Sequence, residues 1–144
     1  MTKKVSNDTL AKEYKRDSNL RGRPAHKELT GKIRSARTIL LSHGYKAAET
    51  SKLAENFREL DLFSLEEQME ALGAALREIS PEDYAGSHPP SKSYERLTRE
   101  RELFAFSWNS EHFKKKMYFK FCLVNTTLFV FSLHESTPKG GGQW

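Results

Sequence analysis

Two short runs near the end of the chain, residues 117–124 and 128–134, combine aromatic and β-branched side chains with polar residues at alternating positions. This composition is typical of β-strands, and both runs are too short for typical helices. Only residues 125–127 separate them, so the pattern predicts a β-hairpin. Residues 103–108 alternate in the same way and predict a third strand that pairs with the hairpin.

The length of the hairpin loop decides which side chains share a face. A three-residue loop pairs Lys120 with Ser132 and Tyr118 with His134, and it also pairs Val124 with Leu128 and Cys122 with Val130. One face is then wholly apolar: Phe119, Phe121, Leu123, Phe129, Phe131 and Leu133. A two-residue loop would instead set Lys120 beside Phe131 and move His134 to the other face. We expect the three-residue loop, because it keeps polar groups out of the core.

Upstream of the strands, three segments carry apolar residues at helical spacing. The first contains Leu29, Ile33, Ala36 and Leu40 and ends before Gly44, a typical residue after a helix C-terminus. The second covers residues 51–59. The third follows a capping box at residues 64–67 and keeps one unbroken apolar face, which we expect to pack on the sheet.

The next stretch is less regular. Ser80 and Pro81 begin a further helical turn that ends near Gly86, and residues 92–101 are either a loop or a short helix.

Charge is distributed unevenly along the chain, whose net charge is +5. Residues 1–48 hold 12 Lys and Arg against 4 Asp and Glu, residues 49–86 hold 3 against 10, and residues 87–144 hold 9 against 5. A basic surface suits a polyanion such as RNA, and it also serves ordinary solubility. We divide the chain into a flexible basic arm (1–24), one α+β domain (25–136) and a flexible tail (137–144).

Several classes of protein are disfavoured by what the sequence lacks. It has no apolar run long enough to span a bilayer and no signal-peptide core near Met1, which favours a cytoplasmic protein. Cys122 is the single cysteine and lies in an apolar strand, so we expect a packed thiol. No P-loop, dinucleotide fingerprint, nucleophile elbow or Cys/His cluster is present, so we expect neither a metal nor a cofactor.

The polar residues of the hairpin suit cleavage of RNA without metal, in which the 2′-hydroxyl attacks the adjacent phosphorus. That reaction needs a base, an acid and cations. Histidine titrates near neutral pH, whereas tyrosine ionises readily only beside positive charge. Lys120 and the run Lys114, Lys115 and Lys116 supply such charge, and Trp108 or Phe113 offers a ring for an unpaired base. Each of these residues also has a plain structural role open to it, such as a solvated sheet face or edge protection.

Residues 29–136 resemble the motility quorum-sensing regulator toxins, which are RelE-like bacterial mRNA interferases. The matching features follow one another in order: Ile79-Ser-x-x-Asp83-Tyr84 followed by Ser87, a Trp with an amide beside it, a Tyr-x-Lys strand, and a last apolar strand with Ser near its end. The resemblance implies an α+β domain with about three helices on a small antiparallel sheet. It also implies an endoribonuclease that cuts single-stranded mRNA without metal and is neutralised by an antitoxin protein.

Carried over by position, the resemblance implies Tyr118, His134 and Asn109 as catalytic residues, and we add Lys120 as the cation of the hairpin. We expect the substrate to be bound by Trp108, Ser132, Lys92 and the three lysines at 114–116. The chain departs from the family at two positions, since His134 stands where the family has lysine, and Gly86 stands where it has another lysine. Lys92 or Lys120 would have to replace that second cation. The rival interpretation is a non-catalytic module that binds nucleic acid or an acidic protein.

Overall fold

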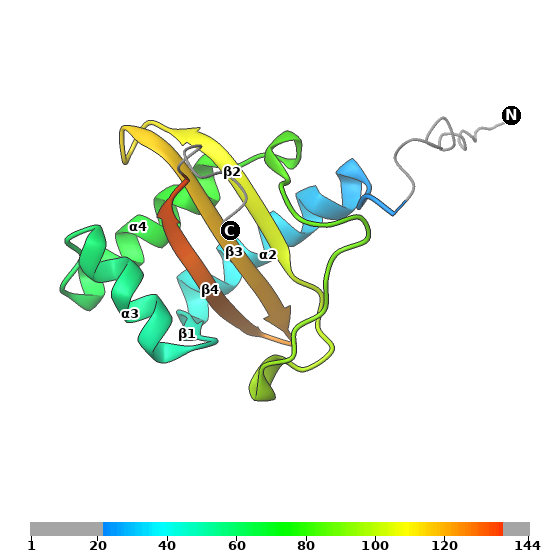
Figure 1. The fold of residues 1–144 in the computed structure, drawn as a ribbon, viewed down its shortest axis with the longest axis horizontal. Helices are drawn as coiled ribbons and strands as arrows, with labels where there is room; N and C mark the ends of the chain where they lie inside the picture. The colour runs from blue at the N-terminus through cyan, green and yellow to red at the C-terminus, as the bar shows by residue number, and fades with distance from the viewer. Residues whose placement is uncertain (1–21, 137–144) are drawn as a thin grey trace, which may run out of the picture.

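The computed structural model describes residues 22–136, which form three α-helices, two 3₁₀ turns and four strands (Figure 1). In chain order these are α2 (His26–His43), β1 (Lys46–Ala47), α3 (Thr50–Glu59), α4 (Leu65–Glu78), η2 (Pro81–Asp83), η3 (Arg96–Thr98), β2 (Phe104–Ser110), β3 (Lys115–Val124) and β4 (Thr127–Glu135). The fold class is α+β, as the sequence predicts.

The helices begin and end close to their predicted positions. The apolar stripe of α2 is buried, and Gly44 caps the helix with a φ of 77° and a hydrogen bond from its N–H to the Leu40 carbonyl. The capping box before α4 is complete, since Ser64 accepts from the Glu67 N–H while the Glu67 carboxylate accepts from the Ser64 N–H. Local sequence signals are therefore sufficient to place these elements.

The sheet has the strand order β1-β4-β3-β2. The three strands β2, β3 and β4 are antiparallel neighbours, as predicted. The short strand β1 adds a parallel pair, with Lys46 opposite Phe129 and Ala47 opposite Val130, so the sheet is mixed. Beyond β1, the side chain of Asn56 on α3 accepts a hydrogen bond from the Leu133 N–H at 2.9 Å and so satisfies the outer edge of β4.

The predicted hairpin loop was one residue too long. Val124 pairs with Thr127 around a two-residue turn, Asn125 and Thr126, in which Asn125 has a φ of 56°. Asparagine tolerates this left-handed region better than most residues. The pairs that follow are Leu123 with Leu128, Cys122 with Phe129 and Phe121 with Val130, so the pairs predicted for Val124 and Cys122 were wrong.

A β-bulge at Phe131 then changes the register again. The pairing shifts between Lys120 and Phe121, after which Lys120 pairs with Ser132 and Tyr118 with His134, as predicted. A bulge adds one residue to one strand, so it restores the alternation that the short turn had reversed. Phe129 and Phe131 consequently lie on the face opposite to the predicted one, where they pack with Cys122 in a second small cluster.

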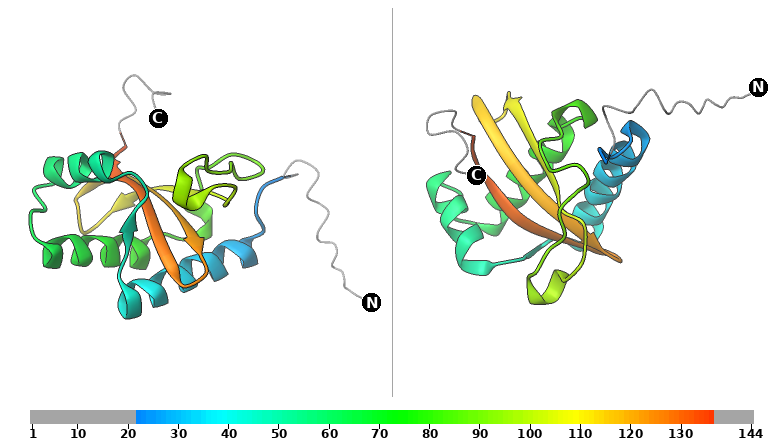
Figure 2. Two further views of the ribbon diagram at one scale, coloured as in Figure 1. Left: turned by 90° about the horizontal axis from the view of Figure 1, so that it is seen from below. Right: turned by 45° about the vertical axis from the view of Figure 1, so that its right-hand side comes forward.

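The main core lies between the helices and one face of the sheet. Figure 1 shows α2 and α4 behind the sheet and α3 beside β4, and Figure 2 shows the same layers from below. The largest fully buried side chains of this core include Phe104, Phe106, Phe119, Phe121 and Leu72. We call the other face of β2, β3 and β4, which carries Ser107, Tyr118, Lys120, Ser132 and His134, the open face.

The segment between α4 and β2 is mostly loop. Ser80 and Pro81 begin η2, and the region that was either loop or short helix contains η3 and a backbone bridge between Lys92 and Glu102. Tyr84 joins the edge of β2 opposite Phe106.

The last residues of the predicted arm pack on the domain, whereas residues 1–21 and the predicted tail lie outside the described residues. Pro24 is buried, and the Arg23 guanidinium lies 5.3 Å from the centroid of the Tyr84 ring and donates to the Pro81 carbonyl at 3.1 Å. Arg23 and Pro24, which the sequence assigned to the arm, therefore contact the domain. Among the helices of residues 22–136, none has the length and apolar character that crossing a bilayer requires.

Candidate functional site

Tyr118 and His134 face each other across β3 and β4 on the open face. Their rings stack with centroids 5.1 Å apart and an interplanar angle of 26°. Lys120 and Ser132 form the next pair on this face, because side chains two residues apart along a strand point the same way. Lys120 is half-buried, whereas Ser132 is only 1% exposed and so is not accessible to bind substrate as predicted. The sheet therefore brings together the four polar side chains that the sequence placed in one site.

β2 extends this site on its other side. Ser107 lies opposite Tyr118, and Asn109 lies opposite Lys116, one pair further along the same face. Asn109 is exposed, and the pairing sets it diagonally from Tyr118. The Ser107 hydroxyl donates to the Ser136 hydroxyl at 3.3 Å, so the side chain of the residue after β4 reaches across β3 to β2. Ser107 and Ser136 had no signal in the sequence, because their proximity depends on the strand order.

The protonation chemistry of the pair follows from its surroundings. Tyr118 is half-buried, and burial raises the pKa of its hydroxyl, so the neutral phenol is the form present near pH 7. Nδ1 of His134 lies 3.0 Å from the Glu135 carbonyl oxygen. A carbonyl only accepts, so Nδ1 carries the proton of this bond, and Nε2 of the neutral ring is then a proton acceptor. The pair thus combines a hydroxyl that can donate with a nitrogen that can accept.

Lys120 lies two residues after Tyr118 on the same face of β3. Burial lowers the pKa of its ammonium, and the positive charge of Lys52 on α3 lowers it further. The ammonium also lies 5.8 Å from the centroid of the Phe131 ring, so the bulged residue forms part of its surroundings. Lys52 was missed in the sequence, since it lies 68 positions before Lys120 and only the packing of α3 beside β4 brings the two charges within reach.

Trp108 does not have the substrate-stacking position that the sequence predicted. It belongs to the helix-facing side of β2, is only 4% exposed, and its indole N–H donates to the Glu78 carboxylate at 2.8 Å. The same carboxylate accepts from the Ser110 hydroxyl and from the His112 N–H. The alternation of β2, which keeps Phe104 and Phe106 inside, necessarily turns Trp108 inwards too. Phe113, the other ring named for stacking, is half-buried against the core.

The three consecutive lysines lie at the turn between β2 and β3. Lys114 has a φ of 61°, and Lys115 pairs with Glu135 across the sheet at 3.7 Å. Lys116 stands on the open face, two residues before Tyr118. All three are exposed, but only Lys116 shares the open face with Tyr118, since Lys115 is on the other face of β3 and Lys114 precedes the strand.

Lys92 and Gly86 lie in the loop before β2. Lys92 is exposed, and its backbone bridges to Glu102 in this loop. A Cβ atom on Gly86 would lie 2.6 Å from the Tyr84 hydroxyl, which itself donates to the Ser87 carbonyl. A side chain at this position would therefore require the Tyr84 ring to shift.

The cysteine thiol and the potential metal ligands do not form a second reactive site within residues 22–136. Cys122 is fully buried and free, and burial raises the pKa of its thiol to about 11, so it is the packed thiol that the sequence predicts. Across the described chain, no three His, Cys, Asp or Glu side chains gather closely enough to hold a metal ion.

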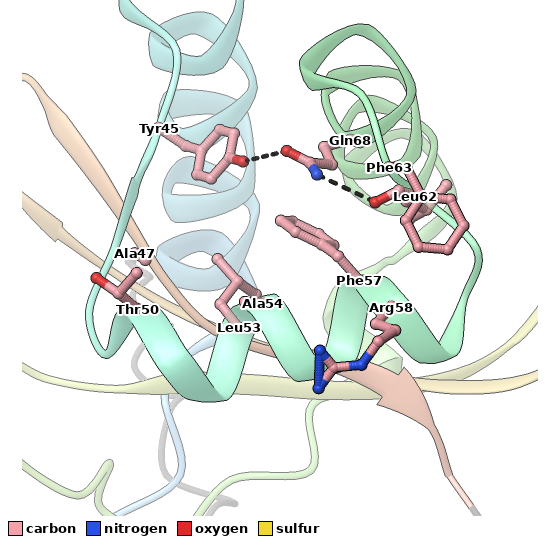
Figure 3. Close-up of a pocket in the computed structure, with 10 residues that line it drawn as sticks. All are labelled: Tyr45, Ala47, Thr50, Leu53, Ala54, Phe57, Arg58, Leu62, Phe63 and Gln68. Carbon is pink, nitrogen blue, oxygen red and sulfur yellow. Dashed lines mark hydrogen bonds between the residues drawn. The ribbon is translucent and has the colours of Figure 1, made fainter.

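An apolar pocket of about 350 Å³ lies apart from the open face, between α3 and the start of α4 (Figure 3). Leu53 and Phe57 form its floor, and Tyr45 closes one side, where its hydroxyl donates to Gln68. Gln68 in turn donates to the Leu62 carbonyl, so Tyr45 and Gln68 are already paired with other groups of the lining. Thr50 and Arg58 are the other polar residues of the pocket, whose remaining lining is apolar.

Comparison of the chain with protein-family models, curated proteins and solved structures finds no match. The function is accordingly argued from the site itself.

Proposed function

We propose that this chain is a metal-independent endoribonuclease that cleaves single-stranded mRNA, and that it acts in the cytoplasm as the toxin of a bacterial toxin–antitoxin system. One observation carries the proposal: Tyr118 and His134 stack across two strands, with Lys120 and Ser132 as the next pair on the same open face. A proton donor, a proton acceptor and a cation thus lie together.

The chemistry assigns one step to each group. Nε2 of His134 takes the proton of the 2′-hydroxyl while O2′ attacks phosphorus, and Lys120 stabilises the negative charge that develops on the phosphoryl oxygens. The P–O5′ bond breaks, and the Tyr118 hydroxyl gives its proton to O5′. The products are a 2′,3′-cyclic phosphate and a 5′-hydroxyl, so atoms and charge balance without a metal or water.

Product analysis tests this mechanism. A long single-stranded RNA is incubated with purified protein in EDTA, and the new ends are identified by mass spectrometry. We expect 2′,3′-cyclic phosphate and 5′-hydroxyl ends, and no cleavage of the same sequence with 2′-O-methyl groups. Cleavage of the 2′-O-methyl strand, or 5′-phosphate products, would overturn the proposal.

The toxin assignment has its own test. Expression of the chain should arrest growth, and a neutralising antitoxin protein should relieve the arrest. Unimpaired growth of cells that accumulate folded protein would contradict a toxin role.

The rival function is a non-catalytic nucleic-acid-binding module, and one observation favours it. Burial raises the pKa of Tyr118 and lowers that of Lys120, which makes the phenol a weaker acid and the lysine a weaker cation. RNA binding that weakens with salt, without cleavage, would identify this second function.

A further inference from the structure

A second cavity, whose lining is mainly polar, lies near the end of β3 that is farther from Tyr118. Its volume is about 540 Å³, and one wall is the exposed side of α2. The opposite wall is formed by Asn125 of the hairpin turn, by Leu123 and by Arg101 of the loop before β2. We call this cavity the basic groove and define it by Lys32, Arg34, Ser35, Thr38, Arg101 and Asn125.

Within residues 22–136, no acidic side chain forms an ion pair with a cation of the basic groove. The groove is lined by the cations Lys32, Arg34 and Arg101 and by no aspartate or glutamate. None of these cations takes part in the ion pairs found within residues 22–136, which involve His26, Arg58 and Lys115. Three cations around one cavity repel each other, and a bound anion removes that repulsion.

Neutral donors accompany these cations. Ser35 and Thr38 follow one another at helical spacing on α2, beside Arg34 and away from the buried stripe. Their hydroxyls and the Asn125 amide can all donate hydrogen bonds. The Lys32 ammonium lies 5.5 Å from the centroid of the Phe104 ring, a cation–π contact that favours this position of the side chain.

Cations and neutral donors without a carboxylate are the groups that bind phosphate oxygens. A cavity of about 540 Å³ is much larger than one phosphate group, and it opens to the surface between a helix and a turn. A chain of phosphates uses such a space better than a single ion, because each Lys or Arg that meets a phosphate releases a counterion.

We propose that the basic groove binds the backbone phosphates of a single-stranded polynucleotide. The groove is separate from the Tyr118 and His134 pair, since Tyr118 and Leu123 are five residues apart, about 17 Å along an extended strand. It therefore holds phosphates other than the one that would be cleaved. This inference adds a second contact for the substrate class of the proposed function, and it stands as a binding site even if the chain has no nuclease activity.

The salt dependence of binding measures these contacts directly. The probe is a fluorescent 20-nucleotide 2′-O-methyl RNA, which attack by a 2′-hydroxyl cannot cleave, and anisotropy titrations are run at several salt concentrations with the full chain. The Arg34→Gln/Arg101→Gln protein should lose two phosphate contacts, so the slope of log K against log salt should become shallower by about 1.4. Thr38→Glu, which places a negative charge in the groove, should weaken binding as well.

A matched control removes the same charge elsewhere. Arg58→Gln/Arg77→Gln lies on α3 and α4, outside the groove, and should leave the slope unchanged. All of the substituted side chains are exposed, and thermal unfolding verifies that each variant folds. Equal slopes for the groove variant and the control would overturn the proposal.

Two further outcomes identify the ligand and separate this proposal from the nuclease. Adenosine 5′-monophosphate should not displace the RNA even at concentrations far above that of the RNA. Efficient displacement would show a site for single phosphates and contradict a polynucleotide groove. If ordinary RNA stays intact while the groove variant still has the shallower slope, the nuclease proposal fails and the groove proposal stands. If RNA is cleaved but the groove variant binds as the wild type does, the groove proposal fails alone.

Discussion

The two faces of the β3–β4 hairpin differ in how deeply their side chains are buried. The helix-facing side carries Met117, Phe119 and Phe121, which are completely buried under α2 and α4, whereas Tyr118, Lys120 and His134 on the open face keep part of their surface exposed. Adjacent residues of β3 therefore have different roles, because they lie on opposite faces of the sheet. The helix-facing side chains stabilise the fold, and the open face is where chemistry is possible.

The largest effect is expected on the helix-facing side. Phe121→Ala removes a fully buried ring that contacts Phe104, Phe106 and Phe119, and should lower the free energy of unfolding by about 3–5 kcal/mol. Denaturant unfolding measures the loss. A loss below about 1 kcal/mol would mean that this side of the sheet is not the packed core.

Tyr118→Phe sharpens the comparison on the open face. The ring that stacks on His134 is retained and only the proton donor is lost, so the rate of RNA cleavage should fall about a hundredfold or more. The exposed Tyr94 provides the matched control, because Tyr94→Phe makes the same chemical change away from the site. Equal rates for the two variants would remove Tyr118 from the mechanism.

Glu78 shows that a polar group under the sheet can be purely structural. Glu78→Gln weakens hydrogen bonds from Trp108, Ser110 and His112 and should cost about 1–2 kcal/mol of stability at pH 7 without changing the cleavage rate constant. Burial opposes ionisation of this carboxyl, but the three hydrogen bonds outweigh it, so its pKa is lowered in the folded protein.

The stability difference between the wild type and Glu78→Gln should depend on pH in one direction. A lowered folded pKa stabilises the protein above the ordinary carboxyl pKa of about 4.3, and the contribution is lost as the pH falls through the folded value. The stability difference between the wild type and Glu78→Gln should therefore shrink between pH 7 and about pH 3. A difference that grows on acidification would contradict the role given to Glu78.

Lys120→Met should have the smallest effect on stability. Unlike Phe121→Ala and Glu78→Gln, it should not lower the stability. Burial and the charge of Lys52 lower the pKa of Lys120, so the charged form costs stability at neutral pH and the variant should unfold at an equal or slightly higher temperature. Because the folded pKa is lowered, the wild type should gain on the variant as the pH rises towards about 10. Cleavage should nevertheless be lost. A clear drop in melting temperature would assign Lys120 to the fold.

Helix positions could be read from the sequence because their signals are local. The capping box at Ser64 and the glycine after His43 each lie within one helical turn of the element that they define. The strand β1 was not predicted, since two residues carry no periodicity and its parallel pairing with β4 depends on the packing of α3.

Two strand pairs of the candidate site, Lys120 with Ser132 and Tyr118 with His134, were predicted correctly through two compensating departures. The loop is one residue shorter than expected, and the bulge at Phe131 restores the pairs of Lys120 and Tyr118. Bulges depend on tertiary fit and leave no clear pattern in one sequence. For the same reason Phe129 and Phe131 were assigned to the wrong face, and Lys52 was not recognised at all.

The most direct test of the central claim is the rate at which a single-stranded RNA is cut in EDTA by the wild type and by His134→Ala, below the melting temperature of both proteins. The account predicts cleavage at repeated sites by the wild type and a rate lower by about a hundredfold or more for the variant. Equal rates would show that cleavage comes from another site or a contaminant, and would contradict an open-face catalytic centre.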